Sequence, residues 1–384
     1  MKLYNCVKSY YYYSVNLYES KLIYKNIFSY SWNTFVENND NEHEILYINN
    51  YDDLEMRKEA EKIFQESLVN QIIEMTDNFS EEIKNQYHIN VLYSIGIDLA
   101  KREYRDEKNI RKDKKKIIIY TIQYEDTHGV ILTSGYSNNC EKFELSSIAD
   151  IFIQDKKKIM EIIQYNWLEK GYKIKEIICS SFVSAIVSHE VFGHLLERDN
   201  FEKVGKIKIS KGFNIYDSSK EGLSGDCLYD DFGNVLKSSI LVKNGELKRL
   251  IGDREEDIPR FRAGNNKILF RVTNTVVEPI EIVKIKNDDG ILQIESVRQA
   301  TIKNGILSLN IEASYIKLNK TLFRIPIFTL NLPIKEVVQN IQCIEGKSAR
   351  LSSVNCIKKN QRCGGIGSIS PALKINLDNT YDIS

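Results

Sequence analysis

The sequence predicts an α+β protein in which an N-terminal α/β region, residues 1–168, precedes a large C-terminal domain, residues 169–384, of mostly antiparallel, barrel-like β structure. Three observations support this prediction. Apolar residues recur at helical spacing in the first half of the chain, β-prone runs separated by turn residues fill the second half, and an apolar segment before His189 has the composition of a buried helix. We expect that helix to carry the active site.

The length and composition indicate a soluble globular protein. A chain of 384 residues exceeds one average domain, so two domains are expected. Its composition, 42% hydrophobic and 28% charged, is ordinary for such proteins. Lysine plus arginine equals aspartate plus glutamate at 53 each, so no net charge attracts nucleic acid or an anionic membrane, and neither is an expected partner.

The chain shows no targeting or membrane pattern. Tyrosine, serine and asparagine interrupt the N-terminus where a secretory signal needs a continuous apolar core. No apolar run reaches the ~18 residues that a membrane span requires. The seven cysteines are scattered and form no C-x-x-C pair, which favours reduced thiols over a disulfide framework. We therefore expect a cytoplasmic protein.

In the N-terminal region we expect strands first and amphipathic helices after them. Short β-prone runs fill Tyr10–Phe35, and helical spacing of apolar residues covers Asp52–Met75 and Ile148–Glu169. Between these helices, turn residues at Asp126–Gly129 predict a hairpin. This region could comprise two small subdomains.

In the C-terminal domain a short strand, Tyr172–Cys179, leads into the helix before His189. From Lys206 onward, strands are separated by glycine, asparagine and aspartate turns. Hairpin signals of this kind predict a large antiparallel sheet or barrel. They occur at Asp231–Asn234, Asn244–Gly245, Asp288–Gly290 and Asn304–Gly305.

The segment that points to chemistry is His189-Glu190-Val191-Phe192-Gly193-His194, or H-E-x-x-x-H. In the zinc-protease pattern H-E-x-x-H, the histidines share one helix face and the glutamate activates a water. At about 100° per residue, a separation of five rotates the second histidine by roughly 140°. Chelation therefore requires a π-type or loosened turn, which Gly193 makes easier. The alternative is a pair of core histidines satisfied by hydrogen bonds.

Four segments resemble the TldD/PmbA family of modulator-of-gyrase metallopeptidases, and specifically its active TldD-type subunit. His189–Asp199 resembles the family's H-E-x-x-x-H signature. Tyr229–Gly252 is similar to a family strand pair, and Arg271–Asn274 to an R-x-x-N segment. Arg362–Gly367, followed by Pro371, resembles the region that supplies a cysteine ligand. The resemblance covers roughly the last 214 residues, in the family's order.

The resemblance implies a zinc-dependent metallopeptidase. The zinc would be held by His189, His194 and Cys363 with water at the fourth position, and three protein ligands with one open position are what a catalytic zinc needs. Glu190 would be the general base, taking a proton from the water and returning it to the leaving amine. The implied substrates are unfolded peptides or peptide precursors.

The third metal ligand has several candidates. Cys363 lies in a glycine-rich polar run, which suits close approach of the backbone to a metal. Its rivals are Glu197, on the same segment as the histidines, and the cysteines Cys356 and Cys227. Glu197 and Asp199 could instead orient a histidine ligand.

The sequence does not decide which residues contact the substrate. Arg254, Arg271 and Asn274 could bind substrate, or each could form a structural ion pair or turn. The resemblance also implies a dimer, of two copies or with a TldE/PmbA-like subunit. The chain departs from the family in a shorter, divergent N-terminal part and in Gly367-Ser368, where the family tends to have Gly-Gln.

Two other functions are compatible with the same residues. One is a non-catalytic peptide-binding or partner subunit that keeps the fold, although such a subunit would be free to lose Glu190. The other is a hydrolase in which a thiol such as Cys363 is the nucleophile, with a histidine as base and no metal. Metal content separates this last function from the metallopeptidase.

Overall fold

The structure is a computed structural model that describes most of the backbone, and side chains from residue 55 onward. Residues outside the description are 1–2, 19–20, 38–43, 49–53, 106–109, 169–170, 206, 230–234, 253–270, 345, 354–355, 359–360, 364 and 384. Also outside are the side chains of 3–54, 102–105, 203, 357–358, 361–363 and 383. Within the described part, no helix combines the length and apolar character needed to cross a membrane.

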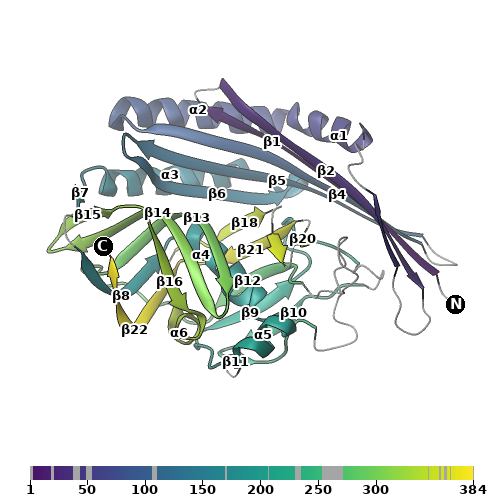
Figure 1. The fold of residues 1–384 in the computed structure, drawn as a ribbon. Helices are drawn as coiled ribbons and strands as arrows, with labels where there is room; N and C mark the ends of the chain where they lie inside the picture. The colour runs from purple at the N-terminus through teal and green to yellow at the C-terminus, as the bar shows by residue number, and fades with distance from the viewer. Residues whose placement is uncertain are drawn as a thin grey trace.

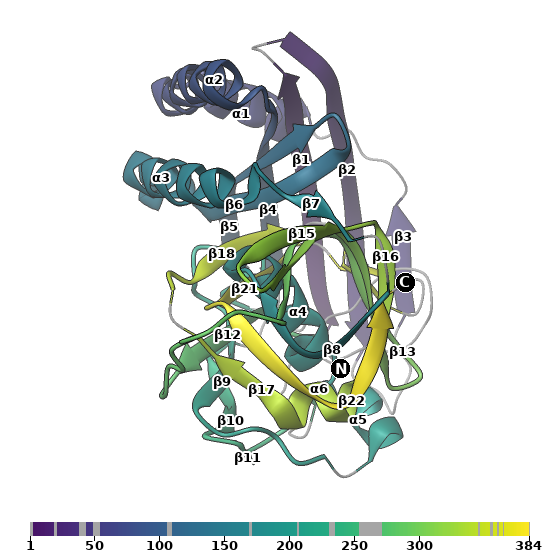
Figure 2. The same ribbon diagram turned by 90° about the vertical axis from the view of Figure 1, so that its left-hand side faces the viewer.

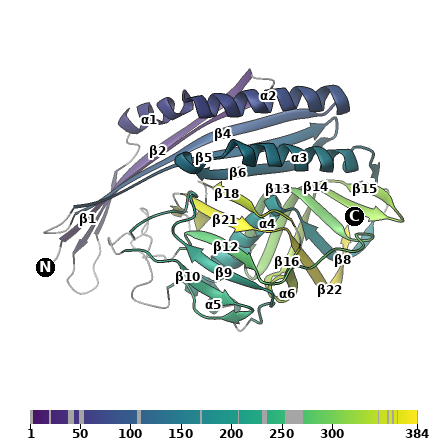
Figure 3. The same ribbon diagram turned by 180° about the vertical axis from the view of Figure 1, so that it is seen from behind.

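The N-terminal region is a six-stranded antiparallel sheet, in the order β3-β2-β1-β4-β5-β6, with helices packed on one face (Figures 1 and 2). Its strands are β1 (Leu3–Tyr18), β2 (Lys21–Glu37), β3 (Glu44–Ile48), β4 (Asn90–Arg105), β5 (Ile110–Asp126) and β6 (Gly129–Asn139). The helices are α1 (Leu54–Phe64), α2 (Ser67–Tyr87) and α3 (Leu145–Ile162), and a short 3₁₀ turn, η1 (Cys140–Lys142), precedes α3. The long strands β1, β2, β4 and β5 extend past α1 at one end (Figure 3).

The predicted elements of this region are confirmed, with shifted boundaries. The helix expected over Asp52–Met75 is two helices, because Glu66 adopts an extended backbone (φ −68°, ψ 152°) between α1 and α2. The hairpin at Asp126–Gly129 joins β5 to β6. Alternate residues of β5, Ile118, Tyr120, Ile122 and Tyr124, are buried in the core with the helices. The residues between them, including Ile119 and Thr121, point to the other face of the sheet.

The C-terminal part contains two larger sheets, both mixed, and a two-stranded sheet of β19 and β20. One has the order β11-β10-β9-β12-β21-β18, and the other β17-β22-β8-β13-β14-β15-β7, with β16 paired to β14. Strands β7 to β12 are β7 (Asn166–Trp167), β8 (Tyr172–Cys179), β9 (Phe213–Ser218), β10 (Ser239–Lys243), β11 (Glu246–Leu247) and β12 (Asn274–Pro279). Strands β13 to β18 are β13 (Leu292–Lys303), β14 (Ile306–Leu318), β15 (Thr321–Ile325), β16 (Phe328–Pro333), β17 (Ile341–Cys343) and β18 (Ala349–Ser353).

The remaining C-terminal elements include the segment that carries the predicted site. The strands are β19 (Cys356–Lys358), β20 (Gln361–Cys363), β21 (Ile366–Ser370) and β22 (Leu373–Ile383). The helices are α4 (Ser181–Ser188), the π-helical turn η2 (His189–His194), α5 (Arg198–Val204) and α6 (Ile334–Asn340).

The C-terminal strands pair mostly antiparallel, as predicted, but the barrel-like arrangement predicted from the sequence is wrong. Among the described residues both larger C-terminal sheets are open, and each contains parallel pairs such as β12 with β21 and β8 with β13. The physical reason is that hairpin turns specify only local antiparallel pairing, whereas these parallel pairs join strands far apart in the chain. The α+β class is confirmed.

The individual hairpin signals have different outcomes. Asn244–Gly245 and Asn304–Gly305 form the expected tight turns, with φ between 46° and 81° at all four residues, a conformation that asparagine and glycine tolerate best. Asp288–Gly290 is a turn that leads into β13 without joining a hairpin. Asp231–Asn234 lies outside the described residues.

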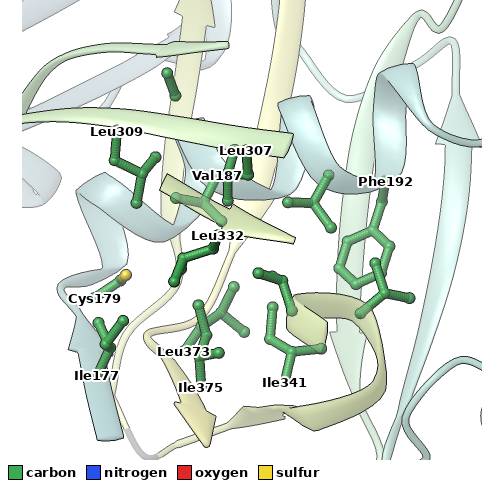
Figure 4. Close-up of a cluster of buried hydrophobic side chains, with 14 of the residues drawn as sticks. Ile177, Cys179, Val187, Phe192, Leu307, Leu309, Leu332, Ile341, Leu373 and Ile375 are labelled. Atoms are coloured by element: carbon green, nitrogen blue, oxygen red, sulfur yellow. The ribbon is translucent and has the colours of Figure 1, made fainter. Parts of the chain in front are cut away.

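The helix that carries the predicted site is buried between the C-terminal sheets. Figure 4 shows Val187 of α4 and Phe192 of η2 in one apolar cluster with Leu332 and Leu373. Above α4, the edge strand β6 of the N-terminal sheet packs against β18, β13 and β14 (Figure 1). The two parts of the chain therefore meet directly above the site helix.

Helix α3 is fixed to the N-terminal sheet by a buried carboxyl group. Asp155 accepts hydrogen bonds from the hydroxyls of Tyr124 and Ser134, each at 2.7 Å. Burial raises the pKa of Asp155 to about 7, and nearby Glu295 acts in the same direction, although both hydrogen bonds oppose the change.

This shift predicts a pH-dependent contribution to stability. Between the ordinary value of 3.8 and about 7, the carboxyl is ionised in the unfolded chain but protonated in the folded protein, so unfolding releases a proton and rising pH favours it. We expect the unfolding free energy of the wild type to fall relative to that of Asp155→Asn by roughly 2 kcal/mol from pH 5 to pH 8. Denaturant unfolding of both proteins measures this difference; a difference independent of pH would contradict it.

Candidate metal centre

The site is built on a helix that changes its winding. Helix α4 begins after Ser180, whose hydroxyl accepts a hydrogen bond from the Val183 backbone N–H at 3.4 Å. It continues directly into the π-helical turn η2, which runs from His189 to His194. This widened turn is the distortion that the five-residue histidine spacing predicts, and it is confirmed.

Gly193 allows the widened turn to pack. A Cβ atom at this position would lie 2.7 Å from Thr275 Oγ1, 3.2 Å from His189 Nδ1 and 3.3 Å from Val272 Cγ1. Only a residue without a side chain therefore fits between His189 and strand β12. Gly193 is therefore needed because neighbouring side chains approach its backbone closely, as well as for its conformational freedom.

The two histidines and a cysteine converge at this turn. The imidazole rings of His189 and His194 have centroids 4.7 Å apart. Cys356, the first residue of β19, places its Sγ 3.3 Å from Nε2 of His194. One ligand atom from each of these buried residues lies within 4.8 Å of the other two, so the group could hold one metal ion.

Of the two histidines, His189 lacks, within the described part of the chain, the hydrogen bonds that a core histidine would make. Its side chain is buried, yet neither ring nitrogen has a hydrogen-bond partner among the residues that the structure describes. Buried polar atoms without partners are costly and rare in native proteins. A metal bound by His189 would remove this cost, and the donor set of two imidazoles and one thiolate is typical of zinc.

The charges in the site favour a thiolate. Burial alone would raise the pKa of the Cys356 thiol, but the neighbouring His189 and His194 rings lower it to about 4. Burial raises the pKa of Glu190, and the same two rings partly oppose that rise. Glu190 directly follows His189 in the sequence and is half-buried. It lines the same pocket as His189 and Cys356.

Behind His194 lies a second group of charged residues. Nδ1 of His194 is 3.2 Å from Glu197 Oε2, and the carboxylate of Glu197 also accepts a hydrogen bond from the Val272 backbone N–H. Arg271 lies 3.6 Å from Glu197 and 3.9 Å from Cys356 Sγ. Glu197 therefore fixes the orientation of His194, which leaves Nε2 directed at the cysteine.

The structure sorts the sequence candidates for the third ligand. Cys356, one of the rivals of Cys363, joins the histidines. Cys227 donates to the Gly225 carbonyl at 3.4 Å and is not in the group. Glu197 takes the orienting role. The Cys363 side chain lies outside the described residues, so its ligand role stays a prediction; its backbone pairs directly with Cys356 in the β19–β20 hairpin.

The three residues suggested for substrate binding have different surroundings. Asn274 is buried and donates to the Ser218 carbonyl and to Asp226, at 2.7 and 2.8 Å, so its amide is structural. Arg271 lies buried among Glu197 and Cys356. Arg254 lies outside the described residues.

A pocket of about 280 Å³ opens onto the site. His189, Glu190 and Cys356 lie at one end of it, and its walls come from strands β5, β6, β18 and β21 and from helix α4. The predicted base therefore has access to a space outside the protein core. The pocket gives access to Glu190, His189 and Cys356.

A model of a known protein family matches the part of the chain that contains this site. The model for the PmbA/TldA metallopeptidase C-terminal domain matches residues 173–375, more than half of the chain. This chain belongs to the PmbA/TldD metallopeptidase family. The match includes His189, Glu190, His194 and Cys356.

Individual relatives agree with this membership. A metalloprotease from Methanocaldococcus jannaschii is 27% identical over a segment that covers 40% of this chain and 36% of that protein, so the chain spans about a third of this curated relative. The structure of TldE from Thermococcus kodakarensis has a TM-score of 0.68 at 11% identity, over 99% of this chain and 96% of that one. A proposed modulator of a DNA gyrase from Thermotoga maritima has a TM-score of 0.65 at 12% identity, over 100% and 96%. These structures show the shared PmbA/TldD fold.

The packing at Gly193 predicts that Gly193→Ala impairs metal binding. Because the added methyl overlaps Thr275 and crowds His189, we expect a loss of about 1–3 kcal/mol of stability and at least a tenfold weaker affinity for zinc. Denaturant unfolding and zinc competition against a chelator measure the two effects. Gly305→Ala is the matched control, since it strains a turn with open space around it (φ +76°) and should leave zinc affinity unchanged. Equal zinc affinity in Gly193→Ala and wild type would contradict this explanation.

Proposed function

We propose that this chain is a zinc-dependent peptidase that hydrolyses unfolded peptides or peptide precursors, and that it is a TldD-type active member of the family. The observation that carries the proposal is the convergence of His189, His194 and Cys356 next to Glu190, at the end of an open pocket. Three protein ligands would leave one position free for water or substrate, which is what a catalytic zinc site requires.

In this mechanism His189, His194 and Cys356 would hold the zinc ion. Bound zinc supplies a Lewis acid that polarises the scissile carbonyl and makes water easier to deprotonate. Glu190 takes the proton from the attacking water as oxygen bonds to the carbonyl carbon. It then returns that proton to the amine nitrogen as the C–N bond breaks. Glu197 and Arg271 keep His194 and Cys356 in position during both steps.

The size of the pocket supports a peptide without tertiary structure. At about 280 Å³ it lies just below the usual range for sites that enclose a whole small ligand, so a folded protein surface cannot enter it. An extended chain can present one backbone carbonyl and one side chain at a time. We propose that the protein acts in the cytoplasm on such chains, as a homodimer or with a TldE/PmbA-like subunit.

Two competing functions make different predictions. A non-catalytic subunit would bind zinc or peptide without turnover; Glu190 next to the predicted ligands argues against it. A thiol hydrolase would use a cysteine as the nucleophile and would cleave without metal. The lowered pKa of Cys356 suits a nucleophile as well as a ligand, so activity after chelation is the discriminating measurement.

Replacing Glu190 by glutamine tests the mechanism. We expect wild-type protein to bind about one zinc per chain and to cleave an unstructured peptide. Glu190→Gln should keep the zinc and lose at least about a hundredfold in kcat, because it cannot accept the proton. Glu202→Gln, a substitution in an exposed ion pair of α5, is the control. Metal analysis and peptide mass spectrometry give both readouts; cleavage by metal-free protein would sink the proposal.

A further inference from the structure

The pocket in front of Glu190 restricts which substrates can bind. It is lined at one end by His189, Glu190 and Cys356, the groups that would act on the scissile bond. Whatever fills the rest of the pocket must therefore lie within one residue of that bond. The shape and chemistry of the remaining walls can restrict which side chain is accepted there.

The volume fits one large side chain. At about 280 Å³ the pocket lies just below the range of sites that enclose a whole small ligand, so it can receive part of a substrate such as a side chain. Part of this space belongs to the carbonyl and the attacking water at the Glu190 end. The remainder can hold an aliphatic or aromatic side chain.

Apart from His189, Glu190 and Cys356, the described side chains that line the pocket carry no charge. Phe182 and Ile186 of α4 form an apolar side, and Ile119, Leu351 and Ile366 extend it from three strands. The other lining side chains in this part are uncharged hydroxyls such as Thr121 and Ser353. An ionised substrate side chain would lose hydration there without meeting an opposite charge among these described residues, whereas an apolar one gains from burial.

The apolar wall is fixed in place by tight packing around Gly135 of β6. A Cβ atom at this glycine would lie 2.8 Å from the Tyr120 carbonyl oxygen and 3.1 Å from Phe182 Cε2. The ring of Phe182 is therefore pressed against the N-terminal sheet, and the side chain of Leu351 lies next to the same point, at 3.5 Å. The pocket has a defined shape because both halves of the chain contribute to it.

We propose that this pocket selects substrates by receiving one large uncharged side chain next to the cleaved bond. The substrate class is then unfolded peptides with leucine, isoleucine, methionine or phenylalanine at one fixed position beside the cleavage site. This inference rests on the proposed peptidase function and adds to it a specificity pocket with Ile186 and Phe182 as the determining residues.

Cleavage of a peptide mixture tests the preference. Zinc-loaded full-length protein is incubated with unstructured peptides that differ at the residues on either side of one bond, and mass spectrometry identifies the products. We expect one of the two positions to favour large apolar residues at least tenfold over aspartate, glutamate, lysine and glycine. Cleavage without such a preference overturns the pocket inference while the peptidase function stands.

Substitutions at Ile186 test the pocket itself. Ile186→Ala widens it and should raise kcat/KM for phenylalanine relative to leucine about tenfold, whereas Ile186→Phe fills it and should shift the preference toward alanine by a similar factor. Opposite shifts at one position cannot come from misfolding. Ile153→Ala, at a position 70% exposed on α3, should leave the preference unchanged.

A binding experiment separates this inference from the proposed function. In zinc-loaded Glu190→Gln, fluorescence anisotropy compares labelled peptides that carry leucine, alanine or lysine at the selected position, with and without Ile186→Ala. If no peptide is cleaved by wild type, the peptidase proposal fails, yet tighter binding of the leucine peptide that Ile186→Ala abolishes still supports the pocket. Equal binding of all three peptides overturns it.

Discussion

The two histidines can face one another only because the helix widens between them. On a regular helix, residues five apart point in directions that differ by roughly 140°, so His189 and His194 could not share an ion. The π-helical turn η2 removes this mismatch and brings their rings within 4.7 Å. The π-helical turn requires glycine at position 193, because Thr275 and Val272 of the adjacent segment occupy the space that a side chain there would need.

The surroundings of the turn supply the charges that the site needs. Glu197 directs His194 from one side, and Arg271 lies between Glu197 and the sulfur of Cys356. These buried charged groups would be costly if isolated, but together they form a compensated set. The N-terminal sheet closes the other side, where β5 and β6 complete the pocket in front of Glu190. Both parts of the chain are therefore needed for the proposed chemistry.

The sequence predicted the local features well and the long-range ones poorly. Helical spacing in α3, the strand β8 and the turn at Asn304–Gly305 are specified by neighbouring residues. The distortion at Gly193 could be predicted because a five-residue spacing conflicts with helix geometry. The barrel-like arrangement was wrong, since the way sheets close depends on strands distant in the chain, and periodicity carries no information about their pairing.

Local sequence also does not decide which cysteine is the third metal ligand. Cys356 and Cys363 stand directly opposite each other in a short hairpin, so nothing in their local sequence decides which one meets the histidines. Likewise, Arg271 could not be recognised as a buried partner of Glu197 and Cys356, because that contact joins segments more than 70 residues apart.

X-ray absorption at the zinc edge tests the central claim most directly. Zinc-loaded wild type and Cys363→Ser should give the same spectrum, with one sulfur at about 2.3 Å and two imidazole nitrogens at about 2.0–2.1 Å, because Cys356 supplies the sulfur. Loss of the sulfur contribution in Cys363→Ser, or its absence from the wild type, would contradict a centre formed by His189, His194 and Cys356.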